Sequence, residues 1–264
     1  MTLKNTQRLP PETLPVLQEH LAVLMACLAA NLVGVYVHGS AAMGGFVSQQ
    51  SDLDYLVLVA NPLTAAERRM LADAYVQLHG TSGLRKGVEM SIVEARFAGA
   101  EFCYPTPYEF HMGSLEQVRH HGEPHTHEHL DPDLASHFTV AATRGVCVYG
   151  AEIDAAFVPV DRKYFWLSNY ANVSVARESI VRDPVYTILN LCRTVCGMRT
   201  GDVYSKQEGA ALFLADARDF RTLVETALAD YRTATISQYD ADETARFVDA
   251  MLAELETRLA VFTR

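Results

Sequence analysis

The sequence predicts an α/β domain followed by a C-terminal bundle of α-helices. Up to about Gly150 the chain alternates helical patterns with short β-prone runs, and beyond Ala155 the patterns are helical only. A length of 264 residues is enough for one large or two modest domains with buried cores. We therefore expect an N-terminal domain over residues 1–155 and a helical domain over residues 156–264.

Five segments of the N-terminal domain have clear periodicity. Apolar residues recur at helical spacing in two of them, whereas the other three are short β-prone runs. The segments are a helix over 13–30, strands over 32–38 and 53–60, a helix over 65–79 and a strand over 87–93. The strand over 53–60 is apolar almost throughout, as expected of a buried strand.

Helix boundaries in the C-terminal domain are marked by capping residues. Asp183 offers a side-chain acceptor at the start of a helix, Pro184 suits its first position, and Gly201 lies just past its end. Residues 205–208, Ser-Lys-Gln-Glu, form a capping box that opens another helix. The last helix is expected over residues 242–262.

Composition and charge exclude several classes of protein. The formal net charge is −10, which argues against sequence-independent binding to nucleic acid and is compatible with a cationic ligand. We find no hydrophobic signal core at the N-terminus and no apolar stretch near the ~20 residues that span a bilayer. The five cysteines include no CxxC pair, which favours free thiols in a reducing compartment. We therefore expect a cytoplasmic protein that binds neither nucleic acid nor membranes. The sequence does not indicate its oligomeric state.

The residues that indicate chemistry begin where the first strand ends. Gly39 lets backbone N–H groups approach a phosphate closely, and Ser40 adds a hydroxyl beside a turn that leads into a helix. Asp52 and Asp54 open the second strand, where alternation puts both side chains on one face and Leu53 on the other. Two carboxylates this close repel one another unless a cation lies between them, and hard oxygen ligands suit Mg²⁺. The pair therefore predicts a magnesium site.

Glu89 is the third acid of this group. It interrupts the otherwise apolar strand over residues 87–93. If this strand neighbours the one that carries Asp52 and Asp54, Glu89 joins them and can either ligate the metal or take the proton from an acceptor hydroxyl. The turn, the aspartate pair and the third acid together indicate phosphoryl or nucleotidyl transfer.

These motifs resemble those of a known superfamily. The residues VYVHGSAAMGGFVSQQSDLDYLVLV over 35–59 and GVEMSIV over 87–93 are similar to the polymerase-β-like nucleotidyltransferases. The wider chain resembles the streptomycin/spectinomycin adenylyltransferase family through YPTPYEFH over 104–111, through residues 131–150, and through the NLCR and SKQEGA motifs within 183–210. The resemblance covers most of the chain and implies a mixed-sheet nucleotidyltransferase fold with a C-terminal helical bundle.

The resemblance also implies a role for each motif residue in the N-terminal domain. Ser40, in the turn that begins with Gly39, contacts the phosphates of ATP. Asp52 and Asp54 hold Mg²⁺, and Glu89 is the general base. The implied reaction is the transfer of AMP from ATP to a hydroxyl of an aminoglycoside or aminocyclitol, with release of pyrophosphate.

In the helical domain, the resemblance implies contacts with both substrates. Arg193 and Lys206 reach the triphosphate, and Asp183, which is also a natural helix cap, lies where relatives contact the drug. Streptomycin-modifying members use tryptophans around the acceptor, and the single tryptophan here is Trp166. Spectinomycin, a streptomycin-like drug or another hydroxylated metabolite therefore all stay open as acceptors. A nucleotidyltransferase that modifies a protein and an inactive nucleotide-binding sensor are the alternative functions.

Histidines gather in a segment that the motifs above do not use. Residues 120–129 read HHGEPHTHEH, and their spacing could bind a transition metal. Gly122 and Pro124 mark the segment as a loop, however, and no cysteine joins it. We interpret it as an exposed polar loop, and His137 as a structural histidine.

Overall fold

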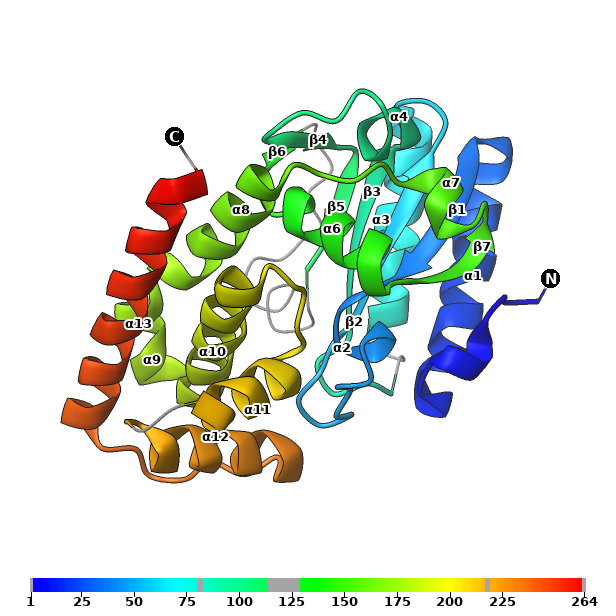
Figure 1. Ribbon diagram of the computed structural model, residues 1–264. Helices are drawn as coiled ribbons and strands as arrows, with labels where there is room; N and C mark the ends of the chain where they lie inside the picture. Colours follow the sequence, from blue (N-terminus) through cyan, green and yellow to red (C-terminus); the bar gives the residue numbers. More distant parts are fainter. Residues whose placement is uncertain (1, 80–82, 114–128, 217–218, 263–264) are drawn as a thin grey trace. The chain divides into compact units, whose positions relative to one another are not determined.

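The chain folds into two compact units, Met1–Val160 and Asp161–Arg264 (Figure 1). The computed structural model describes residues 2–79, 83–113, 129–216 and 219–262. Of the histidine-rich segment 120–129, all but His129 therefore lies outside the described residues.

The division between the units falls after Val160, whereas the sequence pattern placed it after residue 155. The reason is local. A short helix, α7 (Ile153–Ala156), leads into Phe157, and the buried Phe157 ring packs against the rings of Tyr36 and Phe138 in the first unit.

A five-stranded mixed sheet forms the centre of the first unit, which confirms the predicted fold class. Its strand order is β5-β3-β2-β1-β7, in which β2 and β3 are parallel and the other neighbours are antiparallel. The strands are β1 (Leu32–Val37), β2 (Leu53–Val59), β3 (Val88–Glu94), β5 (Phe110–Met112) and β7 (Val146–Gly150). A separate two-stranded sheet pairs β4 (Thr106–Tyr108) with β6 (His129–Asp131).

Helices cover both faces of the five-stranded sheet. They are α1 (Leu14–Leu28), α2 (Gly39–Ala42), α3 (Ala65–His79), α4 (Ala95–Ala98), α6 (Leu134–Arg144) and α7, with 3-10 turns at η1 (Thr6–Arg8), η2 (Pro11–Thr13) and η3 (Ala29–Asn31). Successive side chains of a strand point to opposite faces, so β1 and β2 contribute to two cores. Val35 and Tyr55 pack in the core that contains α1 and α3, whereas Tyr36 and Leu56 pack in the core that contains α6.

The segment Pro11–Asn31 corrects one sequence-based expectation. By length and composition it is apolar enough to cross a membrane, with a mean hydropathy of 1.5 over its most apolar window. In the structure, however, Leu17, Leu21 and Leu24 of α1 are buried in the first core. A core helix passes the same test of length and hydropathy, and its packing on the sheet accounts for its apolar residues.

The second unit is helical, as predicted. Its helices are α8 (Arg162–Ser174), α9 (Ala176–Arg182), α10 (Pro184–Thr200), α11 (Lys206–Asp216), α12 (Arg221–Thr233) and α13 (Ala241–Phe262). Most side chains of α10 are buried because this helix packs against all five of the others. It is therefore the central helix of the unit.

The predicted capping residues mark the ends of α10 and the start of α11. The Asp183 carboxylate accepts a hydrogen bond of 2.9 Å from the backbone N–H of Tyr186, and Gly201 takes the left-handed conformation after the last turn. Ser205 and Glu208 form the reciprocal pair of a capping box, with distances of 2.8 and 3.2 Å between backbone nitrogen and side-chain oxygen. These bonds fix where α10 and α11 begin.

Candidate active site

The turn between β1 and α2 is shaped by Gly39. This residue has a φ of +61°, a left-handed conformation that glycine adopts without strain. A Cβ atom at Gly39 would also overlap the Oδ2 atom of Asp54. From the sequence we expected a glycine here because a phosphate approaches the backbone closely. The structure adds a second reason for a glycine at position 39, namely the packing of the Asp54 carboxylate against the turn. Ser40 follows in α2, and among the described residues its buried hydroxyl has no hydrogen-bond partner.

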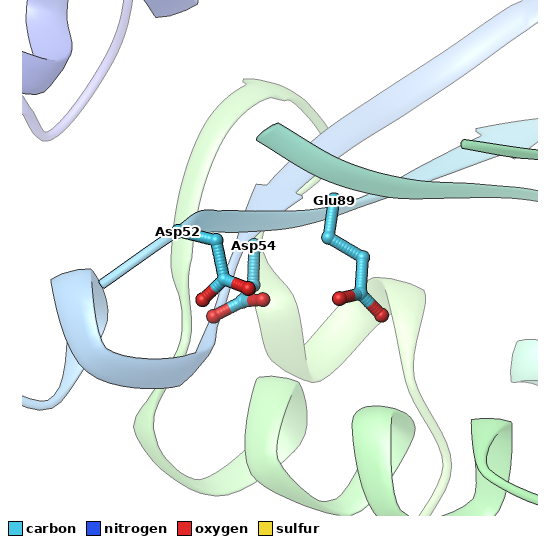
Figure 2. Close-up of side chains that lie close together, drawn as sticks. All are labelled: Asp52, Asp54 and Glu89. Atoms are coloured by element: carbon cyan, nitrogen blue, oxygen red, sulfur yellow. The ribbon is translucent and has the colours of Figure 1, made fainter. Parts of the chain in front are cut away.

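Three acidic side chains converge beside this turn (Figure 2). Asp54 and Glu89 are paired residues in the parallel register of β2 and β3, and Asp52 lies two residues before Asp54. One carboxylate oxygen from each lies within 4.8 Å of the others, and all three side chains are partly buried. Leu53 points to the opposite face and is fully buried in the core. Register and alternation therefore bring together the three acids that the sequence singled out.

The electrostatics of the cluster favour an added cation. Burial, and next the negative charge of Asp52, raise the pKa of Glu89 to about 7. The negative charge of the three carboxylates is thus not balanced by the positive groups around them. Three carboxylates on one small site are the hard, anionic oxygen donors that Mg²⁺ prefers, so the donor set fits this ion.

Further acidic and imidazole groups surround the cluster, and the sequence analysis did not assign them to the site. Asp131 and Asp133 add to the negative potential at Glu89, whereas His137 opposes it. The His137 Nε2 atom lies 3.9 Å from Asp133 Oδ2, one helical turn away. The spacing of Asp133 and His137 at i and i+4 was a possible signal, but it did not indicate which face of the sheet α6 would cover.

His38 links this surrounding group to the turn. Its ring lies 4.8 Å from that of His137, between ring centroids, and its backbone N–H donates to the carbonyl oxygen of Asp54 at 3.0 Å. Burial lowers the pKa of His38 well below its usual value, and repulsion from His137 lowers it further. His38 is therefore neutral at physiological pH, and it serves to pack α6 against the strand end that carries Asp54.

Comparison with known proteins finds similarity to one family of enzymes. Residues 155–254 match the model of the aminoglycoside adenylyltransferase C-terminal domain. A spectinomycin 9-adenylyltransferase of Staphylococcus aureus (strain Mu50 / ATCC 700699) is 26% identical over 217 residues, which cover 80% of this chain and 82% of the relative. The chain is therefore similar to the aminoglycoside adenylyltransferases, in its C-terminal domain and over most of its length. A spectinomycin 9-adenylyltransferase of Enterococcus faecalis is similar at 25% identity over 224 residues, with 79% and 83% covered.

The fold of the chain also matches a solved structure. That structure is spectinomycin adenyltransferase AAD(9) from Enterococcus faecialis with ATP and spectinomycin. The TM-score is 0.77 at 20% identity, and the match covers 92% of this chain and 98% of the other. This match shows the fold, and the similarity in sequence to the two spectinomycin 9-adenylyltransferases confirms the predicted class of enzyme, a nucleotidyltransferase.

The family match includes the predicted site residues of the second unit. Arg193 lies in α10, where its Nε atom donates to Asn190 Oδ1 at 2.5 Å. Lys206 is the first residue of α11, and its Nζ atom lies 4.3 Å from the centroid of the Tyr186 ring. Asp183 is exposed and caps α10. Its structural role as a cap is observed, and its contact with the acceptor stays a prediction.

Proposed function

We propose that this enzyme transfers AMP from ATP to a hydroxyl group of an aminocyclitol antibiotic, with spectinomycin as the favoured acceptor. The observation that carries the proposal is the convergence of Asp52, Asp54 and Glu89 beside the Gly39–Ser40 turn. Similarity to the aminoglycoside adenylyltransferases supports ATP as the nucleotide, and the names of the similar enzymes support spectinomycin.

Each residue of the site has its own role in the proposed reaction. Glu89 takes the proton from the acceptor hydroxyl, whose oxygen forms a bond to the α-phosphorus of ATP. The bond from the α-phosphorus to the bridging oxygen of the β-phosphate breaks, and pyrophosphate leaves. Asp52 and Asp54 would hold Mg²⁺, which when bound stabilises negative charge on the phosphate oxygens. Ser40 and the backbone at Gly39 orient the phosphates.

Glu89 is suited to act as the base because its pKa of about 7 lies near physiological pH. A base with such a pKa is about half ionised at neutral pH, and its ionised form binds a proton strongly enough to remove it from a hydroxyl. Asp133 and Asp131 extend the negative potential beside it. This potential, together with the net charge of −10, favours a cationic acceptor.

The second unit completes the proposed substrate contacts. Arg193 and Lys206 would neutralise charge on the departing pyrophosphate, and Asp183 would bind the acceptor. The position of Trp166 favours spectinomycin over streptomycin. The resemblance places tryptophans at the acceptor in streptomycin-modifying members, whereas Trp166 is only 2% exposed and packs inside the second unit.

A pyrophosphate-release assay with labelled ATP tests the proposal. The purified protein is given Mg²⁺, ATP, GTP or CTP, and either spectinomycin, streptomycin or no acceptor. We expect rapid pyrophosphate release only with ATP and spectinomycin, and labelled AMP on the drug. Label on a polypeptide would instead establish a protein-modifying enzyme, and ATP binding without pyrophosphate release for any acceptor would establish a sensor. Either result contradicts the proposal.

A further inference from the structure

The contact between Lys206 and Tyr186 is built from three helices. Lys206 begins α11, Tyr186 lies in the first turn of α10, and Tyr231 lies in α12. The Lys206 Nζ atom lies 4.3 Å from the centroid of the Tyr186 ring and 6.0 Å from that of Tyr231. Both distances fall within the range in which an ammonium group is attracted to the face of an aromatic ring.

The position of Lys206 on its helix makes this contact informative. A positive charge in the first turn of a helix is disfavoured, because the unpaired backbone N–H groups there carry partial positive charge. A lysine side chain also has four rotatable methylene links, so in water its ammonium group samples many positions. The Tyr186 ring offsets both effects, since it attracts the cation and restricts it to one region.

A second contact fixes α11 against α10 next to Arg193. A Cβ atom at Gly209 would overlap the backbone of Arg193, so the absence of a side chain at Gly209 allows the two helices to approach closely there. Gly209 lies one turn after Lys206. Tyr186, Asn190 and Arg193 are spaced at i, i+4 and i+7, which places them along one face of α10. The face of α10 that carries Arg193 therefore packs against α11, with Lys206 at Tyr186 and Gly209 at Arg193.

We infer that Tyr186 is a positioning residue that holds the Lys206 ammonium group at the face of α10 that carries Arg193, so that the lysine is in place before the triphosphate binds. The inference rests on the proposed function, in which these two cations contact ATP. Tyr186 is 40% exposed and Lys206 is only partly buried, so the contact lies near the surface of the second unit. Such pre-organisation lowers the entropy lost on binding, and its loss weakens ATP binding while the chemical step is unchanged.

Steady-state kinetics of four variants test this inference. Tyr186→Phe keeps the aromatic face and should retain the KM for ATP. Tyr186→Leu removes that face and should raise the KM for ATP about two- to five-fold, with little change in kcat, as expected for an exposed cation–π contact. Lys206→Met should raise the KM for ATP further. The double variant Tyr186→Leu/Lys206→Met should have the same KM for ATP as Lys206→Met alone. Tyr170→Leu is the control, since Tyr170 contacts Glu256 elsewhere in the second unit.

The outcomes separate the inference from the function on which it rests. An unchanged KM for ATP in Lys206→Met would overturn the ATP contact and the inference together. If Lys206→Met weakens ATP binding but Tyr186→Leu does not, only the inference is overturned. It is also overturned if Tyr186→Phe is as impaired as Tyr186→Leu, or if the two single effects add in the double variant, because Tyr186 would then act without Lys206. Thermal unfolding of each variant establishes that the helices remain folded.

Discussion

Among single residues, Glu89 has the most consequential environment. Burial and the neighbouring Asp52 raise its pKa from 4.5 to about 7. In the unfolded chain its pKa returns to an ordinary value near 4.3. Between these two pH values the folded protein binds a proton that the unfolded chain has lost, so the free energy of unfolding falls as the pH rises. The carboxylate that we propose as the base therefore destabilises the metal-free protein at neutral pH and above.

Glu89→Gln should remove this penalty. We expect the metal-free variant to be more stable than the wild type at pH 8 by roughly 1–3 kcal/mol, and the difference to shrink towards pH 5 because Glu89 is then largely protonated. Urea unfolding in the presence of a chelator measures it, with Glu19→Gln on the exposed side of α1 as the control. A difference that is the same at both pH values would show that Glu89 does not titrate as described. The same variant should lose nearly all turnover, since an amide cannot act as the base.

Gly39 and Gly44 provide a matched pair for the turn. Both have positive φ, of +61° and +73°, but a Cβ atom at Gly39 would overlap Asp54, whereas one at Gly44 has no atom within 4 Å. Either change to alanine costs about 1–2 kcal/mol of backbone strain. Only Gly39→Ala should displace the Asp54 carboxylate and lower kcat by about 10²-fold or more, because catalysis is sensitive to misplacement of ~1 Å. Equal kcat values in the two variants, measured by pyrophosphate release, would argue against the close packing of Asp54 on the turn.

At the scale of elements, the site depends on the parallel pairing of β2 with β3. The alternation of Asp52, Leu53 and Asp54 where β2 begins predicted that the two aspartates share a face. That Glu89 joins them depended on which strands are neighbours, which periodicity does not reveal. The helix α3 between β2 and β3 provides the crossover that a parallel pair requires. The three acids and the helix α3 could thus be predicted from the sequence. The pairing register of β2 with β3 could be read only from the structure.

Other elements were less predictable for physical reasons. The strands β4, β5 and β6 have three residues each, too few for a period to appear. Asp131 and Asp133 precede a helix, so their pattern was equally consistent with ordinary capping. Their electrostatic effect on Glu89 arises from contacts between residues far apart in the chain. By contrast, the caps at Asp183 and Ser205 depend on residues three positions away, and local sequence was sufficient to predict them.

The connection between α12 and α13 depends on one buried carboxylate. Asp230 is 3% exposed and accepts four hydrogen bonds, from Thr235 Oγ1, the backbone N–H and Oγ of Ser237, and the Tyr239 hydroxyl, at 2.7–2.9 Å. Burial alone would raise the pKa of Asp230, but these bonds outweigh it and the pKa is lowered. A lowered folded pKa stabilises the protein above the unfolded pKa of about 3.9, and this contribution is lost as the pH falls.

Asp230→Asn should therefore destabilise the protein at pH 7. The amide replaces one acceptor oxygen by a donor, so at least one buried partner loses its hydrogen bond, at a cost of about 1–3 kcal/mol. Urea unfolding should detect the loss at pH 7 and a smaller one near pH 3, whereas Asp219→Asn, at an exposed site in the same unit, should have little effect. A loss that stays constant with pH would contradict the role of the charged carboxylate.

For the whole molecule, the motifs predicted the class of enzyme but not its acceptor. Phosphate binding and metal binding need few residue types at fixed spacing, so they leave a recognisable pattern in the sequence. Acceptor recognition depends on exposed side chains of many types and on how a surface is shaped. The net charge of −10 indicates only the sign of the charge that the protein attracts. The choice of spectinomycin therefore depends on similarity to related enzymes and on the burial of Trp166.

The central claim is that Asp52 and Asp54 hold the magnesium ion that AMP transfer requires. The most direct measurement is Mg²⁺-dependent pyrophosphate release by Asp52→Asn and Asp54→Asn, with Asp73→Asn on the exposed side of α3 as the control. We expect each site variant to lose about 10³-fold or more in kcat, with a melting temperature no lower than that of the wild type in the absence of metal, while Asp73→Asn retains full activity. Near-normal turnover in a folded Asp52→Asn or Asp54→Asn variant would contradict the account.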